Sequence, residues 1–162
     1  MQTIDKITSP LFRPGAGKMV PGLPQTHKVE AQHRRIRLLV VDDEHSIREL
    51  LALYFGIKGL RVTTAGTVSE ARALIERGEF DLLILDWRLG GADGLDLLNL
   101  SKTKHPQLPV LIFTGAEDSE DLLKKAFVGR ADAVVRKMGS FEALAAEVFG
   151  YLDRPDKDGA RL

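Results

Sequence analysis

The sequence of 162 residues has no cysteine, which excludes disulfide bonds, thiolate metal ligands and cysteine nucleophiles. It has no apolar run near the roughly 20 residues that a membrane span requires. The first ten residues, MQTIDKITSP, lack the basic and apolar regions of a secretory signal. These absences predict a cytoplasmic protein that does not cross a membrane.

Net charge is also absent, since 23 basic residues balance 23 acidic residues, but the charge is unevenly distributed. Residues 1–35 carry six basic and two acidic residues and four of the seven prolines, and the remainder of the chain has a net charge of −4. The main body therefore has no field that favours nucleic acids. We expect a mobile basic extension at 1–35, one domain at 36–152 and a polar tail at 153–162.

Five short segments have the length and composition of β-strands. They are Ile36–Val41, Arg61–Ala65, Leu82–Leu85, Val110–Phe113 and Ala133–Val135. Several of them are unbroken apolar runs, which are typical of strands buried on both faces of a parallel sheet.

Five segments with apolar residues at helical spacing alternate with these strands. The expected helices are His45–Lys58, Thr67 or Ser69 to Arg77, Asp93–Lys104, Glu117–Phe127 and Ser140 to about Leu152. Asp93 and Ser140 would be N-caps, and the glycines of Leu89–Gly94 predict a loop. The alternation predicts an α/β fold, in which right-handed crossovers build a five-stranded parallel sheet with helices on both faces. The doubly wound, flavodoxin-like strand order 2-1-3-4-5 suits five strands.

Polar residues stand where the strands end. Asp42 and Asp43 follow the first strand, Asp86 the third and Thr114 the fourth, and Lys137 comes shortly after the fifth. Strands one and three are neighbours in the predicted order, so their three carboxylates would converge. Carboxylates a few Å apart repel by on the order of several kcal/mol, which a proton or a divalent cation relieves. A carboxylate cluster without histidine or cysteine favours Mg²⁺.

These residue types together suit a phosphoryl group. Magnesium, a hydroxyl group and an ammonium group can surround its equatorial oxygens, and a carboxylate can accept it as an aspartyl phosphate. Asp86 stands alone at its strand end and is the candidate nucleophile, whereas Asp42 and Asp43 are candidate metal ligands. Each residue alone is uninformative, because a strand-end aspartate is usually a cap or a turn residue. The prediction rests on the joint pattern with Thr114 and Lys137.

In these motifs the sequence resembles the receiver domain of bacterial two-component response regulators, from Ile36 to about Leu152. The motifs that carry the resemblance are LLVVDDE at 38–44, LDWRLGGADGLDLL at 85–98, FTG at 113–115 and RK at 136–137. The resemblance implies a phosphorelay protein. Asp86 would take a phosphoryl group from a histidine kinase or a phosphotransfer protein.

The resemblance also implies a ligand set at this edge. Asp43 would bind Mg²⁺ directly and Asp42 largely through water, beside Asp86, and the backbone carbonyl of Arg88 would be a further ligand. Thr114 and Lys137 would contact the phosphoryl group.

The family's readout surface corresponds to Glu117–Tyr151, which here would switch the binding of an unknown partner. The chain departs from the family's pattern at Gly90, where proline is frequent, and at Val134, where an aromatic switch residue is frequent. It also has Met138 where proline usually follows the lysine. A non-proline cis bond costs about 3 kcal/mol, so the Lys137–Met138 bond should be trans.

Only ten residues follow Leu152, too few for a DNA-binding domain or an enzyme. The expected protein is therefore a stand-alone regulator or phosphorelay intermediate, a monomer or weak homodimer, and catalytic only toward its own phosphorylation. Two alternatives stay open. Val134 and Met138 motivate a receiver-like adaptor that works without phosphorylation. The aspartate nucleophile also suits a Mg²⁺-dependent phosphohydrolase, although no cap domain would enclose a substrate.

Overall fold

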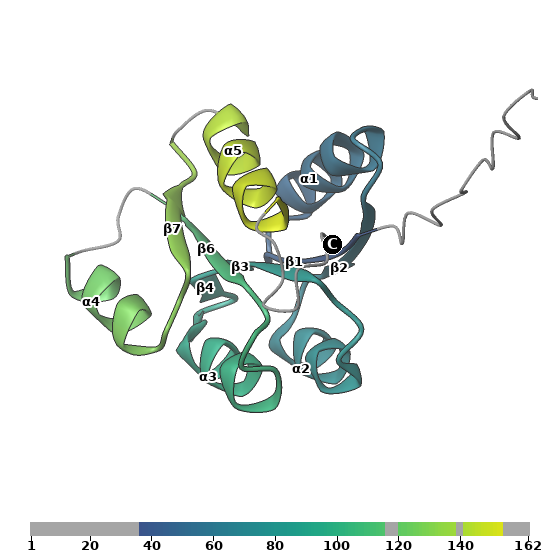
Figure 1. Ribbon diagram of the computed structural model, residues 1–162. Coiled ribbons are helices and arrows are strands. Elements are labelled where there is room, and N and C mark those ends of the chain that lie inside the picture. The colour runs from purple at the N-terminus through teal and green to yellow at the C-terminus, as the bar shows by residue number, and fades with distance from the viewer. Residues whose placement is uncertain (1–35, 116–119, 139–140, 154–162) are drawn as a thin grey trace, which may run out of the picture. The chain divides into compact units, whose positions relative to one another are not determined.

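The fold is built on one sheet of five parallel strands (Figure 1). The computed structural model describes residues 36–115, 120–138 and 141–153. The strands are β1 (Arg37–Val41), β2 (Arg61–Ala65), β3 (Leu82–Asp86), β6 (Val110–Thr114) and β7 (Ala133–Arg136). Their order, β2-β1-β3-β6-β7, confirms the predicted 2-1-3-4-5 arrangement, because β4 and β5 form a separate pair.

Helices cover both faces of this sheet. They are α1 (His45–Ile57), α2 (Val68–Arg77), α3 (Leu95–Lys104), α4 (Glu120–Val128) and α5 (Phe141–Leu152). Figure 1 shows α1 and α5 on one face and α2, α3 and α4 on the other. Within the described ranges, no helix is long and apolar enough to span a bilayer. The alternation of strands and helices confirms the predicted doubly wound α/β class.

The core consists of two apolar layers, one between each face of the sheet and the helices that cover it. Leu38 and Val40 of β1 face the layer of α1 and α5, and Leu39 and Val41 face the layer of α2, α3 and α4. All four side chains are fully buried. Because successive strand residues point to opposite faces, a strand covered on both sides requires an unbroken apolar run. The edge strand β2 is less buried, so its sequence RVTTA can include polar residues.

Helix α2 begins and ends where the sequence predicted. Thr67 is the N-cap, and its side-chain oxygen accepts the N–H of Glu70 at 3.2 Å. The Glu70 carboxylate in turn accepts the N–H of Gly66 at 2.9 Å, an arrangement similar to a capping box. Gly78 ends the helix with a φ of 68°, a left-handed conformation that glycine adopts without a steric penalty.

The segment between β3 and α3 differs from the predicted loop. It forms an antiparallel pair around Gly90 and Gly91, made of β4 (Arg88–Leu89) and β5 (Ala92–Asp93). Both glycines have positive φ angles, 57° and 88°, as a tight two-residue hairpin turn requires. The prediction that Asp93 caps α3 was wrong, because Asp93 belongs to β5. Gly94 occupies the cap position and makes no side-chain cap bond.

Several predictions concern residues that the structure does not describe. They are the basic extension at 1–35, the helical residues 117–119, the Ser140 cap and the tail from residue 154. For these residues the sequence-based expectations stay predictions.

Candidate functional site

The carboxyl edge of the sheet gathers the predicted side chains. Asp42 follows β1 directly, Asp86 ends β3, Thr114 ends β6 and Lys137 follows β7. Strand β3 lies between β1 and β6. Asp42, Asp86 and Thr114 are at most 5% exposed. These three side chains therefore form a buried polar site, and Asp43 beside them is exposed.

One ammonium group joins the two buried carboxylates. Nζ of Lys137 donates to Oδ2 of Asp86 at 2.7 Å and lies 2.7 Å from Oδ2 of Asp42. The backbone N–H of Lys137 donates to the carbonyl oxygen of Thr114 at 2.7 Å, which positions the lysine just beyond β7. Two carboxylates and one ammonium leave a formal charge of −1, and Asp43 adds a further negative charge nearby.

Burial and pairing act in opposite directions on the pKa of Asp86, and they do so on the pKa of Lys137 as well. Burial raises the pKa of Asp86, although the hydrogen bond and charge of Lys137 and the Arg88 N–H act to lower it. Burial also acts to lower the pKa of Lys137, but the close contacts with the carboxylates of Asp42 and Asp86 outweigh it, so that this pKa is raised. The lysine therefore stays protonated, and an excess of negative charge is left to be compensated.

The donor set of this edge fits a hard divalent cation. Asp42, Asp43 and Asp86 each offer a carboxylate oxygen, and these oxygens lie within 4.8 Å of one another. Oδ1 of Asp42 accepts the N–H of Glu44 at 2.9 Å. Oδ2 of Asp42 is buried and, despite the nearby ammonium, receives no hydrogen bond of good geometry from the described residues. Three carboxylates with one incompletely satisfied oxygen suit an ion such as Mg²⁺.

The β4–β5 hairpin is tied to these acids through its backbone. The N–H of Gly90 donates to Oδ2 of Asp43 at 3.0 Å, and the N–H of Arg88 donates to Oδ1 of Asp86 at 3.2 Å. The Gly90 contact was not predicted from the sequence, although the two successive glycines at 90 and 91 indicate the turn. A ligand role for the Arg88 carbonyl stays a prediction.

Gly94 allows the chain to return close to the end of β3. A Cβ atom on Gly94 would lie 2.8 Å from the carbonyl oxygen of Asp86 and 3.0 Å from that of Trp87. The N–H of Gly94 donates to the Trp87 carbonyl at 2.7 Å. Any side chain at this position would therefore press on the backbone that carries Asp86.

Arg48 of α1 belongs to the site but was not identified from the sequence. Its guanidinium donates to the backbone carbonyl oxygen of Asp42 at 2.7 Å. Gly66 leaves room for this side chain, because a Cβ atom there would lie 3.0 Å from the Arg48 Cζ. No motif marks Arg48, since the contact depends on how α1 starts relative to β1.

The two departures from the family's pattern lie on the β7 side. Val134 is partly buried and packs against the apolar layer of α2, α3 and α4. Met138 is 79% exposed. The Lys137–Met138 peptide bond is trans, as predicted. The lysine of the site is therefore followed by an exposed apolar side chain.

The strand order and the converging acids define a doubly wound α/β domain with a buried, acidic carboxyl edge. The family model of the response regulator receiver domain matches residues 38–149, and the chain belongs to this family. Receiver domains of this family act in phosphorelay signalling and are in general not enzymes.

Similar proteins agree with this membership. Response regulator protein PilR of Pseudomonas aeruginosa is 36% identical over 121 residues, which are 75% of this chain and 23% of that protein. A CheY-like receiver domain from Methanospirillum hungatei has a TM-score of 0.70 and 27% identity, covering 74% of this chain and 94% of that chain. A response regulator from Burkholderia pseudomallei, solved with a phosphorylated aspartic acid, a calcium ion and citrate, has a TM-score of 0.64 and 26% identity, covering 68% and 65% of the two chains.

The curated relatives are longer than this chain. The chain spans between about a quarter and about half of their length, and several of their names describe transcriptional regulators. The expectation of a stand-alone regulator without a DNA-binding domain therefore stays a prediction.

Proposed function

We propose that Asp86 accepts a phosphoryl group and that this modification switches a protein-binding surface. The observation that carries the proposal is the Lys137 ammonium, which lies 2.7 Å from both Asp86 and Asp42 beside a third carboxylate. An ammonium that joins two carboxylates can equally join a carboxylate and a phosphoryl oxygen. The phosphorylated aspartic acid and the calcium ion of the Burkholderia relative support both the acceptor and the cation.

Asp86 would react as a carboxylate. One of its oxygens forms the new O–P bond while the N–P bond of a phosphohistidine breaks, and the imidazole leaves with that electron pair. The Arg88 N–H and the Lys137 ammonium hold the carboxylate through its two different oxygens. The raised pKa of Asp86 reflects a carboxylate that burial makes more basic, which favours attack.

Thr114 and Lys137 are placed to bind the phosphorylated product. The Lys137 ammonium can exchange its contact with Asp86 for one with a phosphoryl oxygen. Thr114 ends β6, the strand that pairs with β3, and we expect its hydroxyl to donate to a second phosphoryl oxygen.

The metal would be Mg²⁺, held by Asp42, Asp43 and Asp86 with the backbone carbonyl of Arg88. When bound, it would neutralise negative charge on the transferring group. The chain's own contribution is to hold the three acids together, through the Gly90 N–H on Asp43 and the Lys137 ammonium on the other two.

Mass spectrometry of the intact protein tests the acceptor. Wild-type protein incubated with acetyl phosphate and MgCl₂ should gain the mass of one phosphoryl group, and Asp86→Asn should gain none. Asp96→Asn, on the exposed face of α3, is the matched control and should react like the wild type. The proposal fails if the wild type gains no mass under conditions in which an established receiver domain reacts.

The surface of α4, β7 and α5 is the candidate site for a downstream partner. Phe127 and Val128 of α4 are 62% and 84% exposed, and Met138 is 79% exposed. Met138 directly follows the lysine that would contact the phosphoryl group. Phosphorylation should therefore shift the NMR signals of these three residues more than those of Leu53, an exposed apolar residue of α1.

A second function, partner binding without phosphorylation, is favoured by Val134, which offers no aromatic ring to change position. A pull-down with wild-type protein and Asp86→Ala separates the two functions. Equal recovery of a partner by both forms would support the adaptor function. Recovery that depends on Asp86 and on acetyl phosphate would support the switch.

The donor would be a histidine kinase or a phosphotransfer protein in the cytoplasm, and the receiver would act alone as a monomer or weak homodimer. Transfer of labelled phosphate from a purified kinase tests the donor. Light scattering after size-exclusion chromatography, with and without acetyl phosphate, tests the oligomeric state.

A further inference from the structure

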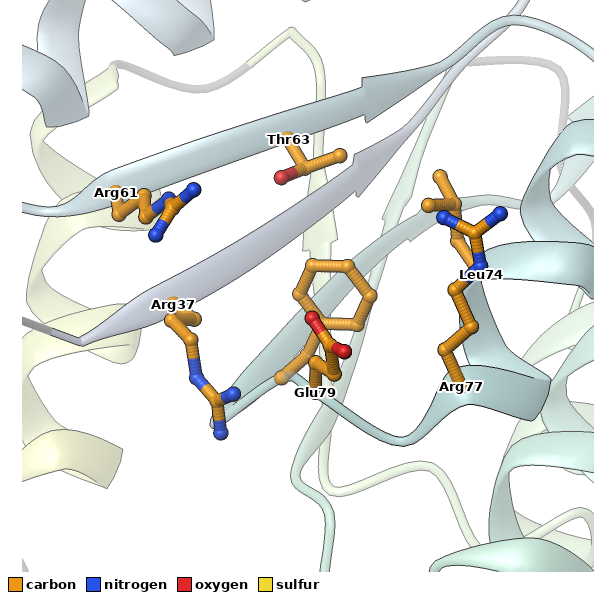
Figure 2. A pocket seen from close by; sticks show the side chains of 7 residues that line it. Arg37, Arg61, Thr63, Leu74, Arg77 and Glu79 are labelled. Carbon is orange, nitrogen blue, oxygen red and sulfur yellow. The ribbon is translucent and has the colours of Figure 1, made fainter.

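A second charged site lies at the opposite, amino edge of the sheet. A cavity of about 240 Å³ is located there, between the first residues of β1 and β2 and the end of α2 (Figure 2). Its basic lining residues are Arg37, Arg61 and Arg77, its other polar residues Thr63 and Glu79, and its apolar residues Leu74 and Phe80. None of these residues takes part in the site around Asp86.

The sheet register places two of the arginines side by side. Arg37 and Arg61 are partners at the first positions of β1 and β2. Both line the cavity on the face that α2 covers, the face to which Leu39 and Ala65 also point. Like charges at paired positions of neighbouring strands destabilise a sheet, so an anion between them would be favourable.

Only one of the three guanidinium groups has a carboxylate partner within the described residues. The guanidinium of Arg37 lies 3.4 and 3.5 Å from the carboxylate oxygens of Asp81. Arg61 and Arg77 are exposed and have no ion pair in the part of the chain that the structure describes. These two groups are therefore available for a ligand.

The lining combines an anion site with an apolar wall and hydrogen-bond acceptors. Guanidinium forks match the oxygens of a phosphate group, and the Phe80 ring can stack on a planar ring. Figure 2 shows Glu79 between Arg37 on β1 and Arg77 on α2. The Glu79 carboxylate and the Thr63 hydroxyl can accept hydrogen bonds from amino or hydroxyl groups. The volume lies just below the roughly 300–1,000 Å³ of typical ligand pockets, which suits a small ligand.

We propose that this cavity binds a nucleoside monophosphate. Arg61, beside Arg37, binds the phosphate, the base lies against Phe80 toward Arg77, and Glu79 and Thr63 accept hydrogen bonds from the sugar or the base. The cavity lies at the opposite edge of the sheet from Asp86. Binding there does not require phosphoryl acceptance, and a failure of either proposal leaves the other intact.

Calorimetric titration of the full chain with AMP, inorganic phosphate and adenosine, each in EDTA, tests the proposal. AMP should bind more tightly than phosphate, and phosphate more tightly than adenosine. The double variant Arg61→Gln/Arg77→Gln should weaken AMP binding at least about tenfold, because the loss of one charged hydrogen bond changes a binding constant by roughly that factor. Arg72→Gln, on the exposed surface of the same helix, is the matched control and should bind AMP within about twofold of the wild type.

NMR distinguishes this cavity from the acidic edge. In an Asp86→Asn background, AMP should shift the amide signals of Arg61 and Thr63 and leave residue 86 unchanged. Phe80→Leu should weaken AMP binding but not phosphate binding. The proposal is wrong if the wild type does not bind AMP at millimolar concentration, if the double variant binds it equally, or if phosphate binds as tightly as AMP.

Discussion

The two edges of one sheet carry opposite charges in opposite environments. Strand β1 begins at Arg37 on the amino edge and is followed by Asp42 on the carboxyl edge. Five residues at about 3.3 Å each separate the edges by roughly 16 Å. Asp42 and Asp86 are 1% and 5% exposed, whereas Arg61, at the amino edge, is exposed.

This difference in burial decides what each charge requires. A buried charge is costly unless a partner compensates it, and the carboxyl edge supplies Lys137 and backbone N–H groups for its carboxylates. An exposed arginine is hydrated and requires no partner. We therefore expect substitutions at the carboxyl edge to change the stability of the fold, and substitutions at the amino edge to change binding alone.

The largest effect is expected when the ammonium group of Lys137, which lies between the two buried carboxylates, is removed. Lys137→Met would leave Asp42 and Asp86 close together without an ammonium, and should lower the free energy of unfolding by about 3 kcal/mol. Urea denaturation in EDTA measures this change. Lys125→Met, on the exposed surface of α4, is the matched control and should change stability little. A loss below about 1 kcal/mol in Lys137→Met would mean that the two edges do not differ as described.

The next largest effect tests whether the acidic edge binds Mg²⁺. A ligand that binds only the folded state, at ten times its dissociation constant, stabilises that state by about 1.4 kcal/mol. Mg²⁺ should therefore raise the unfolding temperature of the wild type, and Asp43→Asn should lose most of this rise because it removes the exposed member of the acidic set. Glu49→Gln, on the exposed surface of α1, should retain it. Equal stabilisation of Asp43→Asn would exclude the acidic edge as the magnesium site.

The carboxyl edge could be predicted from the sequence because it is marked locally. In β1 and β3, an apolar run stops and an aspartate follows, Asp42 in one and Asp86 in the other. The strand order, which follows from the alternation of strands and helices, then places these ends together. Each step needs only residues that are neighbours in the sequence and one topological rule.

The amino edge could not be predicted in this way, because its contacts depend on register. Arg37 and Arg61 become neighbours only through the pairing of β1 with β2. The buried Lys102 of α3 is a similar case, since its ammonium donates to the Leu108 carbonyl at 2.7 Å and pairs with Asp132, 30 residues away. No local pattern distinguishes such a lysine from a solvated one. Contacts of this kind require the packed structure.

A smaller effect concerns the charge of Asp86. Burial raises the pKa of Asp86 in the folded state, so the ionised carboxylate is less favourable in the folded protein than in the unfolded chain. The stability that the protonated form contributes is therefore lost as pH rises through the folded-state pKa. In EDTA, Asp86→Asn should therefore be more stable than the wild type at pH 7. This advantage should shrink as pH falls toward the unfolded-state pKa of aspartate, about 3.9. Urea denaturation between pH 4 and pH 7 measures it, and an advantage that grew toward acid pH would contradict the assigned shift.

The smallest effect is expected at the amino edge. Arg61→Gln/Arg77→Gln removes two exposed guanidinium groups that have no ion pair among the described residues, so the free energy of unfolding should change by less than about 0.5 kcal/mol. Removing the charge of Arg61 also removes its repulsion with the like charge of Arg37 at the paired position. Any change in the free energy of unfolding should therefore be stabilising. Denaturation in urea with and without 0.5 M NaCl, which shortens the screening length to roughly 4 Å, separates this repulsion from lost packing. A destabilisation above about 1 kcal/mol would show that these arginines support the fold, and that the contrast between a structural edge and a binding edge is wrong.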